Sequence, residues 1–215
     1  MKYHAYYFWL FKRSIKQVLR ENYDESYAKE ILKKSKQCYR TLVEEMDDIG
    51  HDNPMAYNAL FALVFVAPYI ASEKRIPPEM IQEMMRRSLY SIRWYFARTD
   101  LNTKRGKASN KKVILRYLDW YTPEREKKYP TSFKVDLEGQ PYEEACYYRI
   151  TRCPICAYAE RLGVDELMPL FCELDDLMIS LEHGVLHRKE TIASGGDCCD
   201  YLILGDKESR AQEDK

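Results

Sequence analysis

The sequence predicts an α+β fold in which a helical N-terminal half packs with a four-stranded, mainly antiparallel sheet that carries two helices. Apolar residues recur at helical spacing over most of residues 1–130. From Phe133 onward, apolar and polar residues alternate as in strands, and turn-forming residues separate the later segments. We therefore expect a helical region (1–130), an α+β region (131–205) that forms one compact domain with the helices, and a charged, frayed tail (206–215).

The composition is that of a globular protein without a charge bias. Of its 215 residues, 46% are hydrophobic, and 34 basic residues balance 34 acidic ones. Because the net charge is near zero, no general attraction to nucleic acid or to an anionic membrane is expected. Residues 1–9 lack the pattern of a secretory leader, and the most apolar run, residues 55–71, is at the short limit for a membrane span. We expect a cytoplasmic protein with a small-molecule substrate or ligand, with homo-oligomerisation left open.

The helices and breaks of the first half follow from periodicity and from proline positions. Helices are expected at residues 4–20, 24–48, 55–71 and 77–96. Residues 100–112 contain Asn, Thr, Gly, Ser and five basic residues, so they are expected to form a solvated loop. An exposed linker is expected around Pro123 and Pro130.

The second half is expected to run strand-strand-helix-helix-strand-strand. The strands are predicted at residues 133–137, 145–151, 186–193 and 199–204, with a turn at 138–141 and a hairpin turn at 194–197. Pro154 is expected to open a short helix that ends near Gly163, and Asp165 to cap the next helix.

Seven cysteines indicate where the chemistry lies. Their odd number and the missing leader favour reduced thiols, metal ligands or a nucleophile over a disulfide framework. Six of them follow residue 145. Cys153 and Cys156 have the C-x-x-C spacing of zinc and redox sites, and a closed zinc site would need Cys172 and Cys199 as further ligands. A divalent metal ion is therefore a candidate cofactor, although one C-x-x-C is weakly specific.

The helix after Asp165 has two sides that avoid water. One side, expected to face the core, carries Leu167, Leu170, Leu174, Met178 and Leu181, and the other carries Met168, Cys172, Asp175 and Ile179. A carboxylate on such a side needs a hydrogen bond, a cation or a polar pocket. A pocket is therefore expected between this helix and the sheet, although Asp175 bonded to a nearby backbone group or hydroxyl is an equally good interpretation.

The last predicted hairpin brings polar groups close to the cysteines. Cys199 and Tyr201 share one face of the final strand. Gly195 and Gly196 permit a tight turn whose amides can bind a carboxylate or an oxyanion.

Several spaced residues in this half resemble a known family signature. They are, in order, Thr151-Arg152-Cys153, Leu162-Gly163, Glu166-Leu167, Phe171-Cys172-Glu173-Leu174-Asp175, Thr191 and Gly195-Gly196-Asp197-Cys198-Cys199-Asp200-Tyr201. This pattern resembles the L-2-amino-thiazoline-4-carboxylic acid hydrolase family over residues 131–204. Tyr201 replaces the usual Phe, and Cys156 and Cys198 are additions. The ending is also similar to smaller 4-vinyl reductase-type ligand-binding domains.

The resemblance implies hydrolysis of L-2-amino-thiazoline-4-carboxylate to N-carbamoyl-L-cysteine, and we expect an enzyme that acts on a carbon–nitrogen bond of a cyclic amidine. The candidate catalytic residues that it implies are Cys153, Cys172, Asp175, Thr191 and Cys199. The candidate substrate-binding residues are Arg152, Arg188, Gly195, Gly196, Asp197 and Asp200. Asp175 can serve as a base, a thiolate can attack, or a divalent ion held by thiolates and Asp175 can activate water.

Two other functions fit the same residues. The chain can be a non-catalytic small-molecule-binding or sensor domain, in which the cysteines serve binding or packing. It can also be a structural zinc protein that acts through partner contacts. Turnover and bound zinc distinguish these from the hydrolase. The hydrolase hypothesis further predicts that Cys153, Cys172 and Cys199 converge in space.

Overall fold

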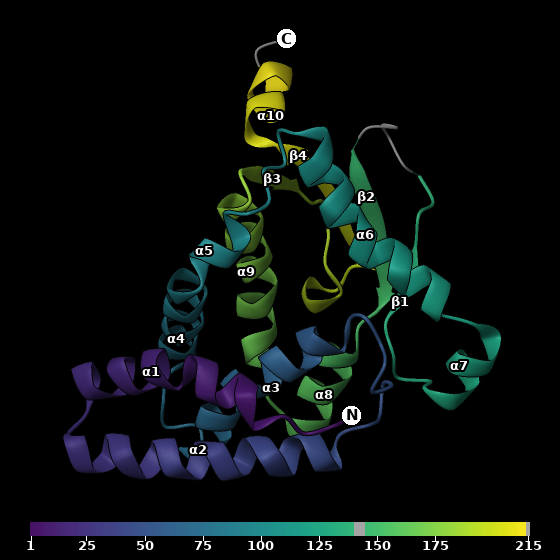
Figure 1. The fold of residues 1–215 in the computed structure, drawn as a ribbon. Coiled ribbons are helices and arrows are strands. Elements are labelled where there is room, and N and C mark those ends of the chain that lie inside the picture. Colours follow the sequence, from purple (N-terminus) through teal and green to yellow (C-terminus); the bar gives the residue numbers. More distant parts are fainter. Residues whose placement is uncertain (140–144, 214–215) are drawn as a thin grey trace.

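A computed structural model describes residues 1–139 and 145–213 and contains the predicted α+β architecture (Figure 1). The α-helices are α1 (Ala5–Asn22), α2 (Glu25–Glu45), α3 (Ala56–Ala71), α4 (Pro78–Ser91), α5 (Arg93–Phe96), α6 (Lys104–Trp120), α7 (Pro123–Lys128), α8 (Pro154–Leu162), α9 (Met168–Leu181) and α10 (Asp206–Glu213). The strands are β1 (Lys134–Asp136), β2 (Cys146–Arg152), β3 (Gly184–His187) and β4 (Cys199–Gly205).

The four strands form one antiparallel sheet in the order β1-β2-β4-β3. In the β2–β4 pairing, Tyr148 lies opposite Tyr201, and Ile150 lies opposite Cys199. Because side chains alternate along strands, these four residues point to the same face of the sheet. This confirms the predicted fold class and places Cys199 and Tyr201 on one face.

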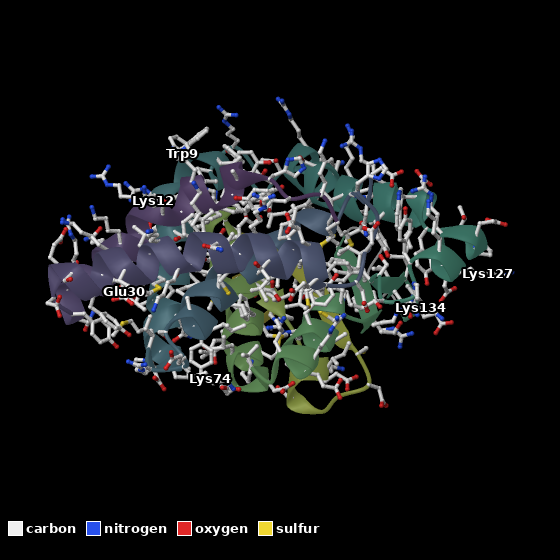
Figure 2. All side chains as sticks on the ribbon, turned by 90° about the horizontal axis from the view of Figure 1, so that it is seen from below. Trp9, Lys12, Glu30, Lys74, Lys127 and Lys134 are labelled. Carbon is white, nitrogen blue, oxygen red and sulfur yellow. The ribbon has the colours of Figure 1, made fainter. Side chains whose placement is uncertain are left out.

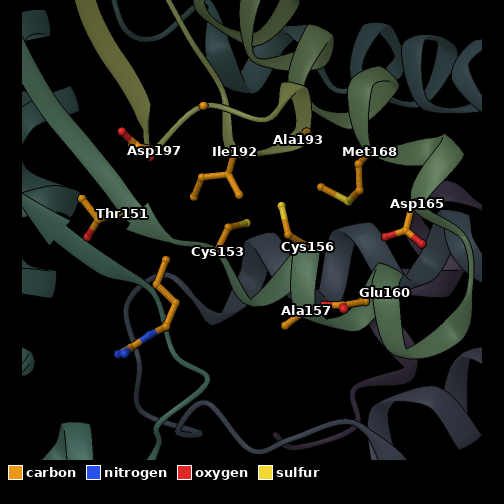
Figure 3. Close-up of a pocket in the computed structure, with 12 residues that line it drawn as sticks. Thr151, Cys153, Cys156, Ala157, Glu160, Asp165, Met168, Ile192, Ala193 and Asp197 are labelled. Atoms are coloured by element: carbon orange, nitrogen blue, oxygen red, sulfur yellow. The ribbon is translucent and has the colours of Figure 1, made fainter.

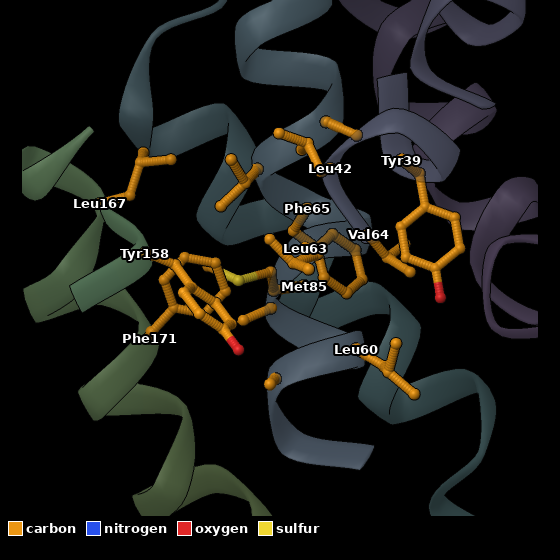
Figure 4. Packing of buried hydrophobic residues seen from close by; sticks show 14 of the residues in the cluster. Tyr39, Leu42, Leu60, Leu63, Val64, Phe65, Met85, Tyr158, Leu167 and Phe171 are labelled. Carbon is orange, nitrogen blue, oxygen red and sulfur yellow. The ribbon is translucent and has the colours of Figure 1, made fainter. Parts of the chain in front are cut away.

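Helix α3 forms the centre of the hydrophobic core. Leu63 and Phe65 of α3 are buried, and Figure 4 shows them near Tyr158 of α8 and Phe171 of α9. The same buried cluster extends from Phe8 in α1 to Cys199 in β4. The core therefore joins side chains of the helical region (1–130) to side chains of the α+β region (131–205).

The segment 100–112 is not the solvated loop that its composition suggested, because α6 begins at Lys104. The Thr103 hydroxyl accepts a hydrogen bond from the Gly106 N–H and caps the helix. Ile114, Tyr117 and Trp120 are buried along its inner side. Of the five basic residues, three are exposed and two, Lys107 and Lys111, are partly buried, so this basic segment forms part of a packed helix and not a solvated loop.

The expected linker around Pro123 and Pro130 is also more ordered than predicted. Pro123 opens α7, and the Thr122 hydroxyl accepts from the Arg125 N–H. Tyr129 is buried and stacks on Trp120, with ring centres 5.9 Å apart. Burial of Tyr129 fixes the end of α7 against α6.

The predicted strand 186–193 is too long, since β3 ends at His187. Beyond it the chain leaves the sheet and forms a short 3-10 helix at Ile192–Ser194. The Asp200 carboxylate accepts hydrogen bonds from the N–H groups of Lys189 and Glu190 at 2.9 and 3.0 Å. These donors are satisfied by a side chain, so the loop needs no neighbouring strand.

Two further features differ from what the sequence predicted, one at Asp165 and one in the C-terminal tail. Asp165 does not cap a helix. It begins a 3-10 turn (Asp165–Leu167) that leads directly into α9, and Val164, the residue before this turn, makes no side-chain cap. The charged tail begins with α10, whose Ser209 hydroxyl hydrogen-bonds the His187 ring at 2.9 Å. Of the turn predicted at 138–141, Gln140 and Pro141 lie outside the described residues.

The surface of the helical part carries many charged side chains. Figure 2 shows Lys12 of α1 and Lys127 of α7 at the edge of the molecule. Among the described residues, no helix is both long enough and apolar enough to cross a membrane.

One buried amide connects the helical region to the segment that enters the sheet. Asn53 donates through Nδ2 to the carbonyl of Ile49 at 2.7 Å and to Oγ of Ser132 at 3.0 Å, and its Oδ1 accepts from the Met55 N–H at 2.8 Å. Both Asn53 and Ser132 are buried. We predict that Asn53→Ala lowers the free energy of unfolding by about 3 kcal/mol, since it leaves several buried polar groups without partners.

Chemical denaturation checks this prediction, with Asn22→Ala as the matched control. Asn22 is exposed and its amide bonds a single carbonyl within its own helix. The control should lose less than about 1 kcal/mol. Equal losses in the two variants would contradict the role given to Asn53.

Candidate active site

Two thiols from distant parts of the chain, those of Cys172 and Cys199, lie close enough for each to shift the pKa of the other. Cys172 lies on α9, and Cys199 is the first residue of β4. The Ile192 N–H donates a hydrogen bond to the Cys199 sulfur at 3.3 Å. The Cys172 thiol is the main cause that lowers the pKa of Cys199 to about 7. Cys199 in turn is the main cause that raises the pKa of Cys172. A thiolate on Cys199 is therefore available near neutral pH.

A carboxylate lies one helical turn beyond the first of these thiols. Oδ2 of Asp175 accepts hydrogen bonds from Nη1 of Arg188 at 2.9 Å and from the Tyr201 hydroxyl at 2.7 Å. Burial raises the pKa of Asp175, although both donors oppose the shift. The Asp175 side chain keeps 23% of its surface exposed, so a small molecule can reach it.

The Arg188 guanidinium connects α9 to the sheet. In addition to Asp175, it binds the carbonyl oxygen of Cys172 through Nη2 at 2.7 Å. Its Cζ lies 5.4 Å from the centre of the Tyr201 ring, which is cation–π distance. The positive charge lowers the pKa values of Asp175 and Cys199, so it favours the ionised form of both groups.

Two tyrosines belong to the site although neither was a candidate. Tyr148 of β2 stacks on Tyr201 of β4, with ring centres 4.6 Å apart and planes 10° from parallel. Burial raises the pKa of both phenols well above their ordinary value, so both stay protonated at neutral pH. The sequence offered one signal, since Tyr201 shares a strand face with Cys199. The cross-strand register that adds Tyr148 is a tertiary feature.

Thr191 and Asp200 serve the loop and not the thiols directly. The Thr191 hydroxyl accepts from the Ser194 N–H at 3.1 Å and donates to the Ser194 hydroxyl at 2.9 Å. Asp200 binds the backbone at the start of the same loop. Together they hold the loop that presents the Ile192 N–H to the Cys199 sulfur.

The glycines of this loop also make internal bonds. The amides of Gly195 and Gly196, which the sequence suggested for anion binding, donate to the carbonyls of Ile192 and Thr191. A Cβ on Gly196 would come within 2.5 Å of the Glu190 carboxylate. These glycines therefore allow a tight, self-bonded loop.

Glu190 bonds the far end of this loop. Its carboxylate accepts from the Asp197 N–H at 3.1 Å and from the Cys198 thiol at 3.3 Å. Asp197 itself is exposed and lines a groove beside the loop.

The groove has a volume of about 800 Å³ and runs between β2, α8 and the loop before β4 (Figure 3). It is lined by Thr151, Arg152, Cys153, Cys156, Ala157, Glu160, Asp165, Met168, Ile192, Ala193, Gly196 and Asp197. Its position differs from the predicted pocket between the sheet and α9, because the chain after His187 turns into a loop and forms one wall. Ile192 lines this groove and also hydrogen-bonds Cys199.

Cys153 and Arg152 contribute to the groove in ways that the sequence did not distinguish. The Cys153 and Cys156 side chains both line the groove, and Cys156 raises the pKa of Cys153. The Arg152 guanidinium binds the Ser132 carbonyl at 2.8 Å and the Tyr121 hydroxyl at 2.9 Å. It also faces Glu126 at 3.4 Å. Arg152 thus binds residues before the sheet, whereas Arg188 is the guanidinium that contacts Asp175 and the Cys172 carbonyl.

The four cysteines considered for zinc form two separate pairs. Cys156 raises the pKa of Cys153, and Cys199 raises the pKa of Cys172. Within residues 1–139 and 145–213, no three Cys, His, Asp or Glu side chains are arranged to hold a metal ion. The structure of these residues therefore does not assemble the four-cysteine site.

The lowered pKa of Cys199 predicts its alkylation behaviour. Because thiolates react and thiols do not, the alkylation rate of Cys199 by iodoacetamide should rise with pH and level off above a midpoint near 7. Cys172→Ala removes the S–H donor, so the midpoint should move to higher pH. Peptide mass spectrometry at a series of pH values measures both midpoints, and an unchanged midpoint in the variant would disprove the thiol pairing.

Comparison with known proteins places these residues in one family. The sequence model described as L-2-amino-thiazoline-4-carboxylic acid hydrolase matches residues 57–203. No curated protein and no solved structure matches the chain. The match covers more than half of the 215 residues and includes Cys172, Asp175, Arg188 and Cys199. The chain therefore belongs to the L-2-amino-thiazoline-4-carboxylic acid hydrolase family.

Proposed function

We propose that this protein opens a small cyclic amidine acid, such as L-2-amino-thiazoline-4-carboxylate, to an N-carbamoyl amino acid, with Cys199 as the nucleophile. The observation that carries the proposal is the Cys172–Cys199 pair, in which one thiol ionises near neutral pH beside Asp175 and Arg188. The family membership supports a hydrolase, and the paired thiols supply a nucleophile and a proton donor.

The atoms of substrate and product identify the bond that breaks. In N-carbamoyl-L-cysteine, both nitrogens remain on the carbon that was C2 of the thiazoline ring, and the sulfur becomes a free thiol. Water therefore replaces the ring sulfur, and the bond that breaks is carbon–sulfur. This corrects the expectation, drawn from the sequence, that a ring carbon–nitrogen bond breaks.

The first half-reaction uses both thiols. The Cys199 thiolate attacks C2, the ring carbon–sulfur bond breaks, and the departing sulfur takes the Cys172 proton. The product of this step is an isothiourea on Cys199, with the substrate's own thiol released and Cys172 left as a thiolate. Cys199 is the main cause of the raised pKa of Cys172, so the bond from Cys199 to C2 removes that cause and frees the Cys172 proton for the departing sulfur.

The second half-reaction restores the enzyme. Water adds to the isothiourea carbon, one water proton goes to the Cys172 thiolate and the other to the former ring nitrogen. The carbon–sulfur bond to Cys199 then breaks, the carbonyl of the carbamoyl group forms, and Cys199 leaves as a thiolate. Both cysteines return to their starting protonation states.

Asp175 and Arg188 are proposed to orient the substrate. Oδ2 of Asp175 is taken by Arg188 and Tyr201, while no described residue donates to Oδ1. Oδ1 can therefore accept a hydrogen bond from the amidine nitrogen and hold C2 near Cys199. Arg188 has more N–H donors than its contacts with Asp175 and Cys172 use, so it can also bind the substrate carboxylate.

A turnover assay with mass spectrometry tests this proposal. Purified protein is offered L-2-amino-thiazoline-4-carboxylate, with and without added divalent ions, and N-carbamoylcysteine is quantified. Cys199→Ser should lower kcat by at least about a thousandfold because it removes the nucleophile. Asp175→Asn should lower it by about a hundredfold or more, because the amide's second polar atom is a donor and not an acceptor.

Cys38→Ala is the matched control, because Cys38 lies on α2, among core residues of the helical region. It should keep the wild-type kcat. Full activity in Cys199→Ser would refute the nucleophile, and no product from the wild-type protein under any metal condition would refute the proposed substrate.

A further inference from the structure

A second pair of thiols, Cys153 and Cys156, has no role in the proposed hydrolysis. Cys153 is the N-cap residue of α8, and Cys156 follows in the first turn of that helix. Residues three apart on a helix are neighbours, so the spacing brings the two side chains together. Pro154 occupies the first helical position, where its fixed φ stabilises the turn.

The Cys153 and Cys156 thiols both face the open space of the groove. The hydrogen bond with Cys156 is the main cause that raises the pKa of Cys153, with burial second. Figure 3 shows both thiols on the wall of the groove, below Ile192. Each residue is half-buried, so a small molecule in the groove can reach the pair.

Three of the other cysteines are held protonated at neutral pH. Burial is the main cause that raises the pKa of Cys38, Cys146 and Cys198 to about 11 in each case. In Cys198 the neighbouring Glu190 adds to this effect. None of the other five cysteines, all of which lie in the described part of the chain, lines the groove, which sets Cys153 and Cys156 apart.

We propose that Cys153 and Cys156 form a thiol–disulfide exchange site that takes a low-molecular-weight disulfide bound in the groove. The C-x-x-C spacing at the start of α8 and the position of both thiols in the lining of a groove of about 800 Å³ carry this inference. It is independent of the proposed hydrolysis, which uses Cys172 and Cys199.

The exchange balances without any further reactant. The thiolate of one cysteine attacks a sulfur of the small disulfide, forms a mixed disulfide and releases one small thiol. The second cysteine then attacks the protein sulfur of that mixed disulfide and releases the other small thiol. The protein's two thiols are oxidised to one disulfide, and the small disulfide is reduced to two thiols.

The test equilibrates the full-length protein with glutathione at several ratios of oxidised to reduced form. Free thiols are then alkylated, and the peptides are mapped by mass spectrometry. The wild-type protein should lose alkylation at Cys153 and Cys156 together and show a disulfide between them. Cys156→Ser should stop at a mixed disulfide between Cys153 and glutathione, because the second attack is impossible.

Two controls make the result specific. Cys38→Ser should oxidise as the wild-type protein does, and Cys199→Ser should still form the Cys153–Cys156 disulfide, since the readout requires no turnover. Full alkylation of both thiols at the most oxidising ratio would overturn the proposal. A disulfide between Cys172 and Cys199 in place of the predicted one would overturn it too.

Discussion

The site is organised around one carboxylate oxygen, Oδ2 of Asp175. It accepts hydrogen bonds from Arg188, in the loop after β3, and from Tyr201, on β4. Because Asp175 belongs to α9, this single atom connects the helix to two parts of the sheet region. A buried carboxylate without such partners would be strongly unfavourable, so the position of α9 and the conformation of the loop depend on each other.

The same arrangement balances the charges around the thiols. Asp175 raises the pKa of Cys199, whereas Arg188 and the Cys172 thiol lower it. With Asp175 alone nearby, the Cys199 thiol would be held protonated at neutral pH. The Asp175–Arg188 ion pair therefore lets the Asp175 carboxylate lie close to a Cys199 thiolate. The proposed cysteine-based hydrolysis at an amidine carbon requires this arrangement.

The loop between β3 and β4 supplies a backbone hydrogen-bond donor to the Cys199 sulfur. Asp200 and Thr191 hold its first part, and Glu190 holds its end. Several residues that match the family signature thus act on the loop's shape. Their contribution to the chemistry is the placement of the Ile192 N–H against the Cys199 sulfur.

The sequence by itself determined the α+β fold class, the buried helix α3 and the strands around Cys199, because periodic burial of apolar side chains is written into residue spacing. It also singled out Cys172 and Asp175, since residues three apart share a helix face. It misjudged 100–112 and 186–193, where a Thr cap and an Asp side chain satisfied backbone groups in ways that local composition does not reveal. Only the tertiary structure decided that Cys172 pairs with Cys199, that Tyr148 stacks on Tyr201, and that Arg188 joins the site while Arg152 binds elsewhere. Those partners are distant in the chain, and their contacts depend on strand register and helix packing, which no local pattern specifies.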